Sequence, residues 1–179
     1  MTPAERLMML MLCEIYEKTL GKVGDFDPTF IRKSVAGGDL WAIEMEYSGL
    51  ALDYTVEPDV AREVIDILDM YAFIEETVER LTAAEKASLP AGRDRFRGFD
   101  GNNETEHMGA AQLIVEDMGR FPRFKGRGFN AHMPTLAGYR RMLDVFKPIR
   151  ASLGARAGTP GLTVAELNEI LDAKAHPAP

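Results

Sequence analysis

The feature that most constrains this chain is a run of apolar residues at helical spacing from Val60 to Leu81. Side chains that recur every three or four residues share one face of an α-helix. No other stretch keeps this spacing for so long, so we expect it to be the central hydrophobic helix of the fold. Its apolar positions are Val60, Val64, Ile67, Leu68, Tyr71, Ile74, Val78 and Leu81.

Helix-start signals recur through the rest of the sequence. Thr2, Thr82 and Thr163 each stand three residues before a glutamate, the capping-box pattern that satisfies free amides at a helix start. Further starts are predicted at Asp27-Pro28, Asp39 and Pro134-Thr135, and Pro148 is expected to limit the last of these helices. The pattern predicts an all-α, multihelical single domain of about seven or eight helices over residues 1–173, with a disordered tail over 174–179.

Extended structure has little support in the sequence. A strand is conceivable only near Leu50 to Val56 and in the short segment Arg93 to Asp100. The helix predicted at the N-terminus carries an apolar stripe that we interpret as core or as a dimer face. The stripe consists of Leu7, Met8, Met11, Leu12, Ile15 and Leu20.

The sequence has no residue pattern typical of a metal site or a redox site. The central helix has many acidic residues, but no histidine pairs with them at the Glu-x-x-His spacing of di-metal bundles, so we expect a solvated face. The one cysteine, Cys13, excludes an internal disulfide and lies among apolar residues, so we interpret it as a buried spectator. We predict no cofactor, no metal site and no catalytic residue.

Charge is distributed unevenly over a chain whose net charge is -7. Residues 1–92 hold 8 Lys/Arg against 18 Asp/Glu, whereas residues 93–150 hold 11 against 7. A basic centre in an acidic chain either docks against the acidic helices or meets an anionic ligand. We favour internal docking, because an acidic chain repels polyanions at long range.

The segment from Phe96 to Leu143 departs most from simple helical pattern. Arginines, phenylalanines and glycines interleave in it, and a planar or phosphorylated ligand suits such a setting. The candidate ligand-binding residues are Phe99, Asp100, Glu104, Arg120, Arg123, Asn130 and His132. The alternative is a structural plug, in which Asp100 caps a helix, His107 forms a surface pair with Glu104, and the phenylalanines pin the segment to the core.

Several short motifs together resemble one known family. They are Ala4-Glu5-Arg6-Leu7, Val64 to Tyr71, Gly98-Phe99-Asp100 with Glu104, Gly119-Arg120-Phe121, Phe129-Asn130-Ala131 with Pro134, and Tyr139 with Arg141-Met142-Leu143. The chain resembles the bacterial YfbU family up to about residue 173. That resemblance implies an all-helical, dimeric, cytoplasmic module without established catalytic residues. Some members resemble fusions with a helix-turn-helix segment, for which we expect no room in this chain.

Three functional hypotheses follow from these observations. The first is a homodimeric ligand-binding or regulatory module without catalytic activity, acting on a small anionic or planar ligand and dimerising through the first or the central helix. The second is a small-molecule hydrolase or transferase that uses Asp100 or Glu104 with His132. The third, and least favoured, is nucleic-acid binding through the basic centre from Arg93 to Arg127.

Localisation rests on what the sequence lacks. No apolar run approaches the length of a membrane span. The opening, Met1 to Arg6, has no basic start typical of a secretory signal. We therefore expect a cytoplasmic protein without membrane contact.

Overall fold

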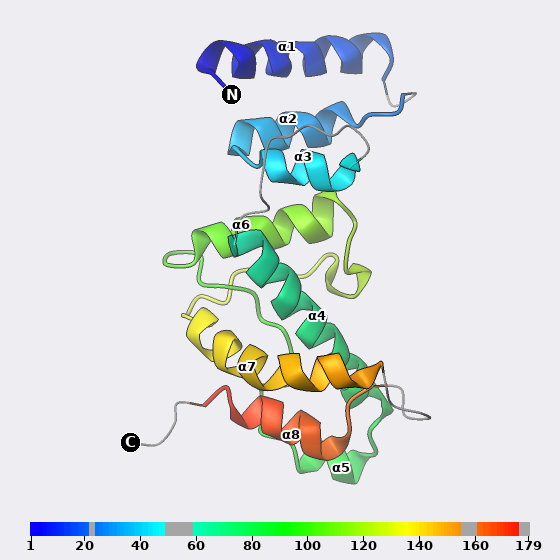
Figure 1. Cartoon of the computed structure of the whole chain (residues 1–179), viewed down its shortest axis with the longest axis vertical. Coiled ribbons are helices and arrows are strands. Elements are labelled where there is room, and N and C mark those ends of the chain that lie inside the picture. The colour runs from blue at the N-terminus through cyan, green and yellow to red at the C-terminus, as the bar shows by residue number, and fades with distance from the viewer. Residues whose placement is uncertain (22–23, 49–58, 155–160, 176–179) are drawn as a thin grey trace. The chain divides into compact units, whose positions relative to one another are not determined.

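The computed structural model describes residues 1–21, 24–48, 59–154 and 161–175. These residues form eight α-helices and no sheet, which confirms the predicted all-α class (Figure 1). They fall into two compact units: residues 1–58 with 116–118, and residues 59–115 with 119–179. No helix in the described ranges is long and apolar enough to cross a membrane.

The helices begin where the capping signals predicted. Thr2, Thr82 and Thr163 each form a complete capping box, and Asp27 accepts from the amides of Thr29 and Phe30. The helices are α1 (Pro3–Thr19), α2 (Pro28–Gly37), α3 (Leu40–Glu46), α4 (Asp59–Arg80), α5 (Ala83–Ala87), α6 (Thr105–Gln112), α7 (Leu136–Leu153) and α8 (Val164–Asp172). A π-helical turn, Leu113–Asp117, extends α6, and Pro122–Phe124 forms one 3-10 turn.

Two local predictions were wrong. Asp39 does not cap α3 with its side chain; its carboxylate instead accepts from the indole Nε1 of Trp41 at 3.1 Å. Pro148 does not end α7, which continues to Leu153. Beyond the proline, Arg150 pairs with Asp69 at 2.9 Å and lies 4.6 Å from the ring of Phe73, contacts that favour the helical course. The strand considered near Leu50 to Val56 lies outside the described residues.

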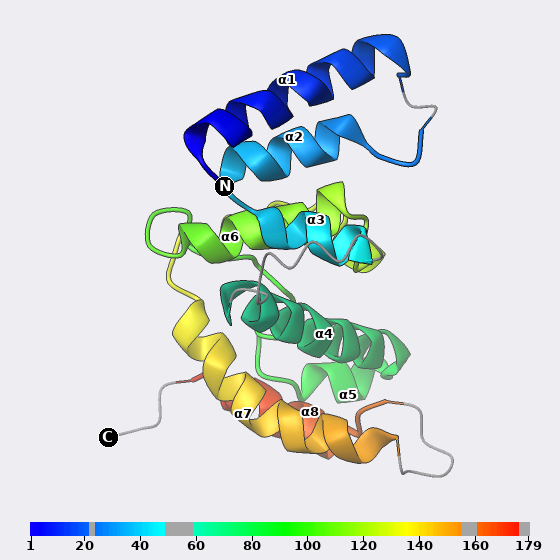
Figure 2. The same cartoon turned by 45° about the horizontal axis from the view of Figure 1, so that its top comes forward.

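In the first unit, α1 lies beside α2 (Figure 2). Cys13 is buried, as predicted, and burial raises the pKa of its thiol. Arg32 pairs with Glu17 at 3.3 Å, and Arg6 donates to the carbonyl of Ala36. The apolar stripe predicted on this helix is not core, because its side chains are exposed.

The second unit is built around α4. The side chains of Val64, Ile67, Leu68, Tyr71 and Ile74 are fully buried, as expected for a central helix. Helix α6 packs on α4, and α7 packs on both α4 and α8. The buried side chains from these partners are Ala110, Ala111, Ile114, Tyr139, Met142, Phe146, Leu167, Ile170 and Leu171.

Phe96 is the centre of an aromatic cluster in this unit. Its ring centroid lies 5.4 Å from those of Tyr71 and Phe124, 5.7 Å from that of Phe99 and 5.9 Å from that of Tyr139. Most of these pairs meet edge to face or tilted, the arrangements that ring quadrupoles favour. The phenylalanines of the central segment therefore join that segment to α4 and α7.

Lys174, which follows α8, contacts the aromatic cluster around Phe96. Its ammonium donates to the hydroxyl of Tyr71 at 2.9 Å and lies 5.0 Å from the ring of Tyr139. Burial lowers the pKa of Lys174 to about 8, and the positive charges of Arg97 and Arg93 act in the same direction. Burial also raises the pKa of Tyr139 to about 12.

We expect Phe96→Ala to lower the free energy of unfolding by about 3–5 kcal/mol, because it removes the ring at the centre of the cluster and leaves a cavity. Urea unfolding of the purified chain measures this. Phe26→Ala is the control, since that ring is 37% exposed and should cost about 1 kcal/mol or less. Equal losses in the two variants would contradict this account of the core.

Lys174 also predicts a pH dependence of stability. The unfolded lysine, with a pKa near 10.4, holds its proton more tightly than the folded one, so stability gains with pH between about 8 and 10. Thermal unfolding of the wild-type chain and Lys174→Met, measured from pH 7 to 10, should show their difference shifting in favour of the wild type as pH rises. Ionisation of unfolded tyrosines near pH 10 affects both proteins equally and cancels. A constant difference would show that burial does not disfavour the charged amine.

Candidate functional site

Five of the seven predicted site residues gather where two distant segments meet. The amide of Phe99 donates to the carbonyl of Phe129, and the amide of Ala131 donates to the carbonyl of Phe99, both at 2.8 Å. This isolated parallel bridge needs a glycine at position 98, where φ is +84° and a Cβ would lie 2.1 Å from the Phe129 carbonyl oxygen. The residues brought together are Phe99, Asp100, Glu104, Asn130 and His132.

Glu104 uses its carboxylate to hold the start of α7. It accepts from the amides of Asp100, Thr135 and Leu136 at 2.8–2.9 Å, and from the hydroxyl of Thr135 at 3.0 Å. Burial raises the pKa of this group, but the hydrogen bonds outweigh burial and hold the pKa below its ordinary value. Glu104 is therefore a charged acceptor for amides that α7 leaves without helical partners.

Asp100 and Asn130 serve the loop backbone in the same way. Asp100 accepts from the amide of Asn102 at 3.0 Å and the side chain of Asn103 at 2.6 Å, and these bonds lower its pKa. The Asn130 side-chain oxygen accepts from the amides of Gly101 and His132 at 3.1 and 2.9 Å. His132 is exposed and adopts φ +56°, a left-handed conformation that non-glycine residues rarely take.

The remaining two predicted residues do not join this group. Arg123 forms an ion pair with Glu79 of α4, and Arg120 is exposed, with its amide donating to the carbonyl of Ile114. Arg127 forms a bidentate pair with the buried Glu75, with both distances at 2.8 Å. Internal docking of the basic centre is thus confirmed for Arg123 and Arg127.

Only part of the acidic set on α4 forms the solvated face that the sequence predicted, because Glu76 and Glu79 are exposed whereas Glu75 is buried. Glu63 binds Arg140 at 2.7 and 2.9 Å, and that bidentate bond, helped by His107, lowers the pKa of Glu63 to about 2. Asp66 and Asp69 pair with cations of α7 at 2.7 and 2.9 Å. The prediction failed in part because helical periodicity identifies the apolar face of a helix but not the cations that approach its polar face.

His107 was also misplaced by sequence reasoning. Its side chain is buried rather than paired with Glu104 at the surface, and its Nε2 lies 2.9 Å from a carboxylate oxygen of Glu63. A signal for this existed, because His107 precedes the buried residues Ala110, Ala111 and Ile114 by three, four and seven positions. Glu63, His107 and Arg140 form a polar cluster that joins α4, α6 and α7.

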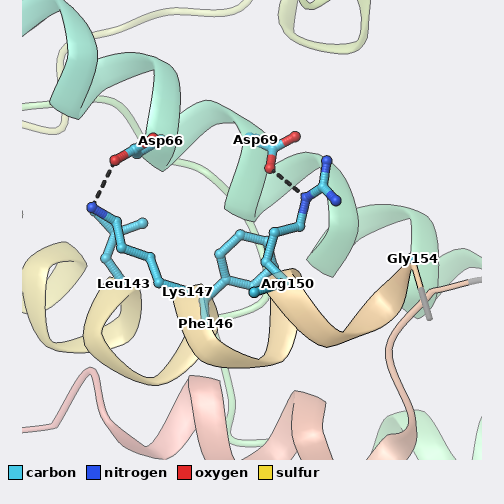
Figure 3. A pocket seen from close by; sticks show the side chains of 8 residues that line it. Asp66, Asp69, Leu143, Phe146, Lys147, Arg150 and Gly154 are labelled. Carbon is cyan, nitrogen blue, oxygen red and sulfur yellow. Dashed lines mark hydrogen bonds and ion pairs between the residues drawn. The ribbon is translucent and has the colours of Figure 1, made fainter. Parts of the chain in front are cut away.

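A groove between α4 and α7 lies apart from the predicted constellation. It encloses about 380 Å³ and shares none of its lining residues with that set. Figure 3 shows Asp66 and Asp69 on one wall, and Lys147 and Arg150 on the other, above Leu143 and Phe146. Each ion pair is partly exposed, with side-chain exposures of 59% for Lys147 and 47% for Arg150, so solvent screens both pairs.

Sequence comparison identifies the family. The YfbU domain matches residues 1–173, nearly the whole chain. The chain belongs to the YfbU family. A curated relative, UPF0304 protein MJECS11 of Methanocaldococcus jannaschii, is 30% identical over 89 residues, which are 47% of this chain. The match spans about half (53%) of the length of that relative.

The described residues of this YfbU chain contain no preformed metal site. No group of three or more His, Cys, Asp or Glu among them is placed to hold an ion. The carboxylates of the candidate regions accept hydrogen bonds from amides or pair with cations instead.

We expect Glu104→Gln to destabilise the chain by about 1–3 kcal/mol at neutral pH. An amide has one acceptor oxygen where the carboxylate offers two, so either the amides of Thr135 and Leu136 or the amide of Asp100 lose their partner. Chemical unfolding measures the loss, with Glu106→Gln, an exposed position two residues further along the chain, as the control. The loss should shrink as the pH falls below the ordinary range for glutamate, because hydrogen bonds hold the pKa of the native carboxylate below that range and only there does it gain a proton. If the variant were as stable as the wild type at pH 7, Glu104 would not stabilise the start of α7.

Proposed function

We propose that this YfbU chain is a cytoplasmic, homodimeric ligand-binding or regulatory module without catalytic activity, and that its ligand is a small anion. The observation that carries the proposal is the groove between α4 and α7 (Figure 3). Its volume of about 380 Å³ falls in the range typical of small-molecule sites.

The charges of the groove support an anionic ligand. Lys147 and Arg150 stand three residues apart on α7, so their side chains share one helix face. Two cations one turn apart match a phosphate group or a dicarboxylate, and Arg150 adds the planar fork that binds such groups in a bidentate manner. Solvent screens the ion pairs that these cations form with Asp66 and Asp69, so breaking each pair costs at most about 1 kcal/mol.

Binding is favoured over catalysis by the state of the predicted acid–base groups. A general base needs a lone pair that is free to accept a proton from the substrate. Glu104 instead accepts from three amides and one hydroxyl, and Asp100 accepts from an amide and an asparagine side chain. Binding to nucleic acid is disfavoured because Arg123 and Arg127 pair with carboxylates of α4.

The predicted constellation is the second place where we propose that a ligand binds. Asn130 and His132 reach the surface beside Phe99 and Asp100, and Arg120 and Arg123 were grouped with them from the sequence as cations for an anionic ligand. The side chains of Asp100, Glu104 and Asn130 already accept hydrogen bonds from backbone amides, so they are less free to bind a ligand than the side chains of the groove. A useful experiment therefore has to separate the two locations.

Thermal unfolding with inorganic phosphate, ATP and citrate as probes tests the proposal. We expect a saturable rise in Tm with at least one probe, since a ligand at 100 times its Kd stabilises a chain by about 2.7 kcal/mol. Lys147→Gln and Arg150→Gln should abolish the rise, whereas Lys18→Gln, which removes an exposed, paired lysine on α1, should retain it.

Two other results would redirect or remove the proposal. A rise abolished by Arg120→Ala and Asn130→Ala, but not by the groove variants, would move the site to the predicted constellation. No rise with any probe in the wild-type chain would contradict an anion-binding module.

A further inference from the structure

Exposed apolar surface is concentrated on one helix of the first unit. Of the large apolar side chains exposed in the described ranges, all but Met133 lie within residues 1–26. Those of Leu7, Met8, Met11, Leu12 and Ile15 are each 54–59% exposed. Their spacing places them on one face of α1, opposite the face that carries the buried Cys13 toward α2.

We infer that this face of α1 is the surface through which two copies of the chain dimerise. The inference rests on the homodimeric module proposed above and names its interface. Of the two helices considered for dimerisation, α4 has its apolar residues buried, with Val64, Ile67 and Leu68 fully covered. Helix α1 retains an apolar face for a partner.

The size of the face matches the core of a dimer interface. Five half-exposed side chains, at roughly 100 Å² apiece, give on the order of 500 Å² of apolar surface, as large as the largest patches of ordinary monomers. A standard interface buries about 800 Å² on each partner, with a polar rim around an apolar core. The α1 face would therefore supply the apolar core of such an interface, with flanking polar residues as its rim.

A cavity lies at the margin of this face, on the side of α1 that turns toward α2. It has a volume of about 140 Å³, is lined by apolar residues that include Met9, Leu12, Phe26 and Ile31, and shares Leu12 with the face. Its volume is comparable to the ~150 Å³ cavities that accept a benzene-sized guest, so it has room for one aliphatic side chain. In a two-fold interface the same patch of both copies is in contact, so a side chain at the margin of one face can reach the cavity at the margin of the other.

The charges of α1 favour a second copy over a membrane. The middle of the face carries no charged residue, so two identical faces meet without opposing like charges. Glu14 and Lys18 pair with each other at 2.6 Å at its edge. The helix has three glutamates against Arg6 and Lys18, whereas helices that lie on anionic membranes are rich in basic residues.

Sedimentation of the full chain tests the interface. We expect the wild type to be a dimer, and Met11→Glu to raise the dimer dissociation constant at least 100-fold, because it places a carboxylate at the centre of both faces. Ala87→Glu, which adds the same charge at an exposed position of α5, should leave the dimer intact. Circular dichroism melting checks that Met11→Glu remains folded, as its 54% exposure predicts.

Disulfide crosslinking tests the interface without weakening the dimer. A residue near the two-fold axis faces its own copy, so Met11→Cys in a Cys13→Ala background should form an intermolecular disulfide on mild oxidation. Lys86→Cys on α5 in the same background should not.

The outcomes separate the interface from the dimer itself. A wild-type dimer that Met11→Glu leaves intact, without the disulfide, would place the interface elsewhere and leave the homodimeric module standing. If the wild-type chain is monomeric at 100 µM, both the α1 interface and the homodimeric module are wrong. A monomer that pellets with phosphatidylcholine–phosphatidylglycerol vesicles, and loses this property in Met11→Glu, would replace the second copy by a membrane surface.

Discussion

The second unit depends on the pairing of α4 with the basic residues that follow it in the chain. Carboxylates along α4 meet cations from residues 123–150: Glu63 with Arg140, Asp66 with Lys147, Asp69 with Arg150, Glu75 with Arg127, and Glu79 with Arg123. The exposed pairs among them, such as Asp66 with Lys147, contribute at most about 1 kcal/mol each. Their main effect is to select the orientation in which later segments pack, while burial of the apolar face of α4 supplies the stability.

Much of the fold was accessible from the sequence because helix starts are local. The boxes at Thr2, Thr82 and Thr163 form as predicted, since each needs only a hydroxyl, a carboxylate and the amides between them. The predictions for Asp39 and Pro148 were wrong because side-chain contacts decide each one. The indole of Trp41 donates a hydrogen bond to the carboxylate of Asp39. After Pro148, Arg150 pairs with Asp69 and contacts the ring of Phe73, which stabilises the helical turn there.

The site was accessible only in part. The sequence singled out Phe99, Asp100, Glu104, Asn130 and His132, and the structure brings them together around one backbone bridge. Arg123 was grouped with them because it is near in sequence, yet its partner is Glu79, 44 residues earlier. The groove walls come from helices some 80 residues apart, and no pattern within either helix reveals that their polar faces meet.

The position of Trp41 has a practical consequence. It is the one tryptophan of the chain and lies in the first unit, with its indole nitrogen bonded to Asp39. Its fluorescence therefore reports on the first unit, whereas the far-ultraviolet dichroism of the helices reports on both units together. Coincident or separate transitions of the two signals distinguish one cooperative unfolding event from two.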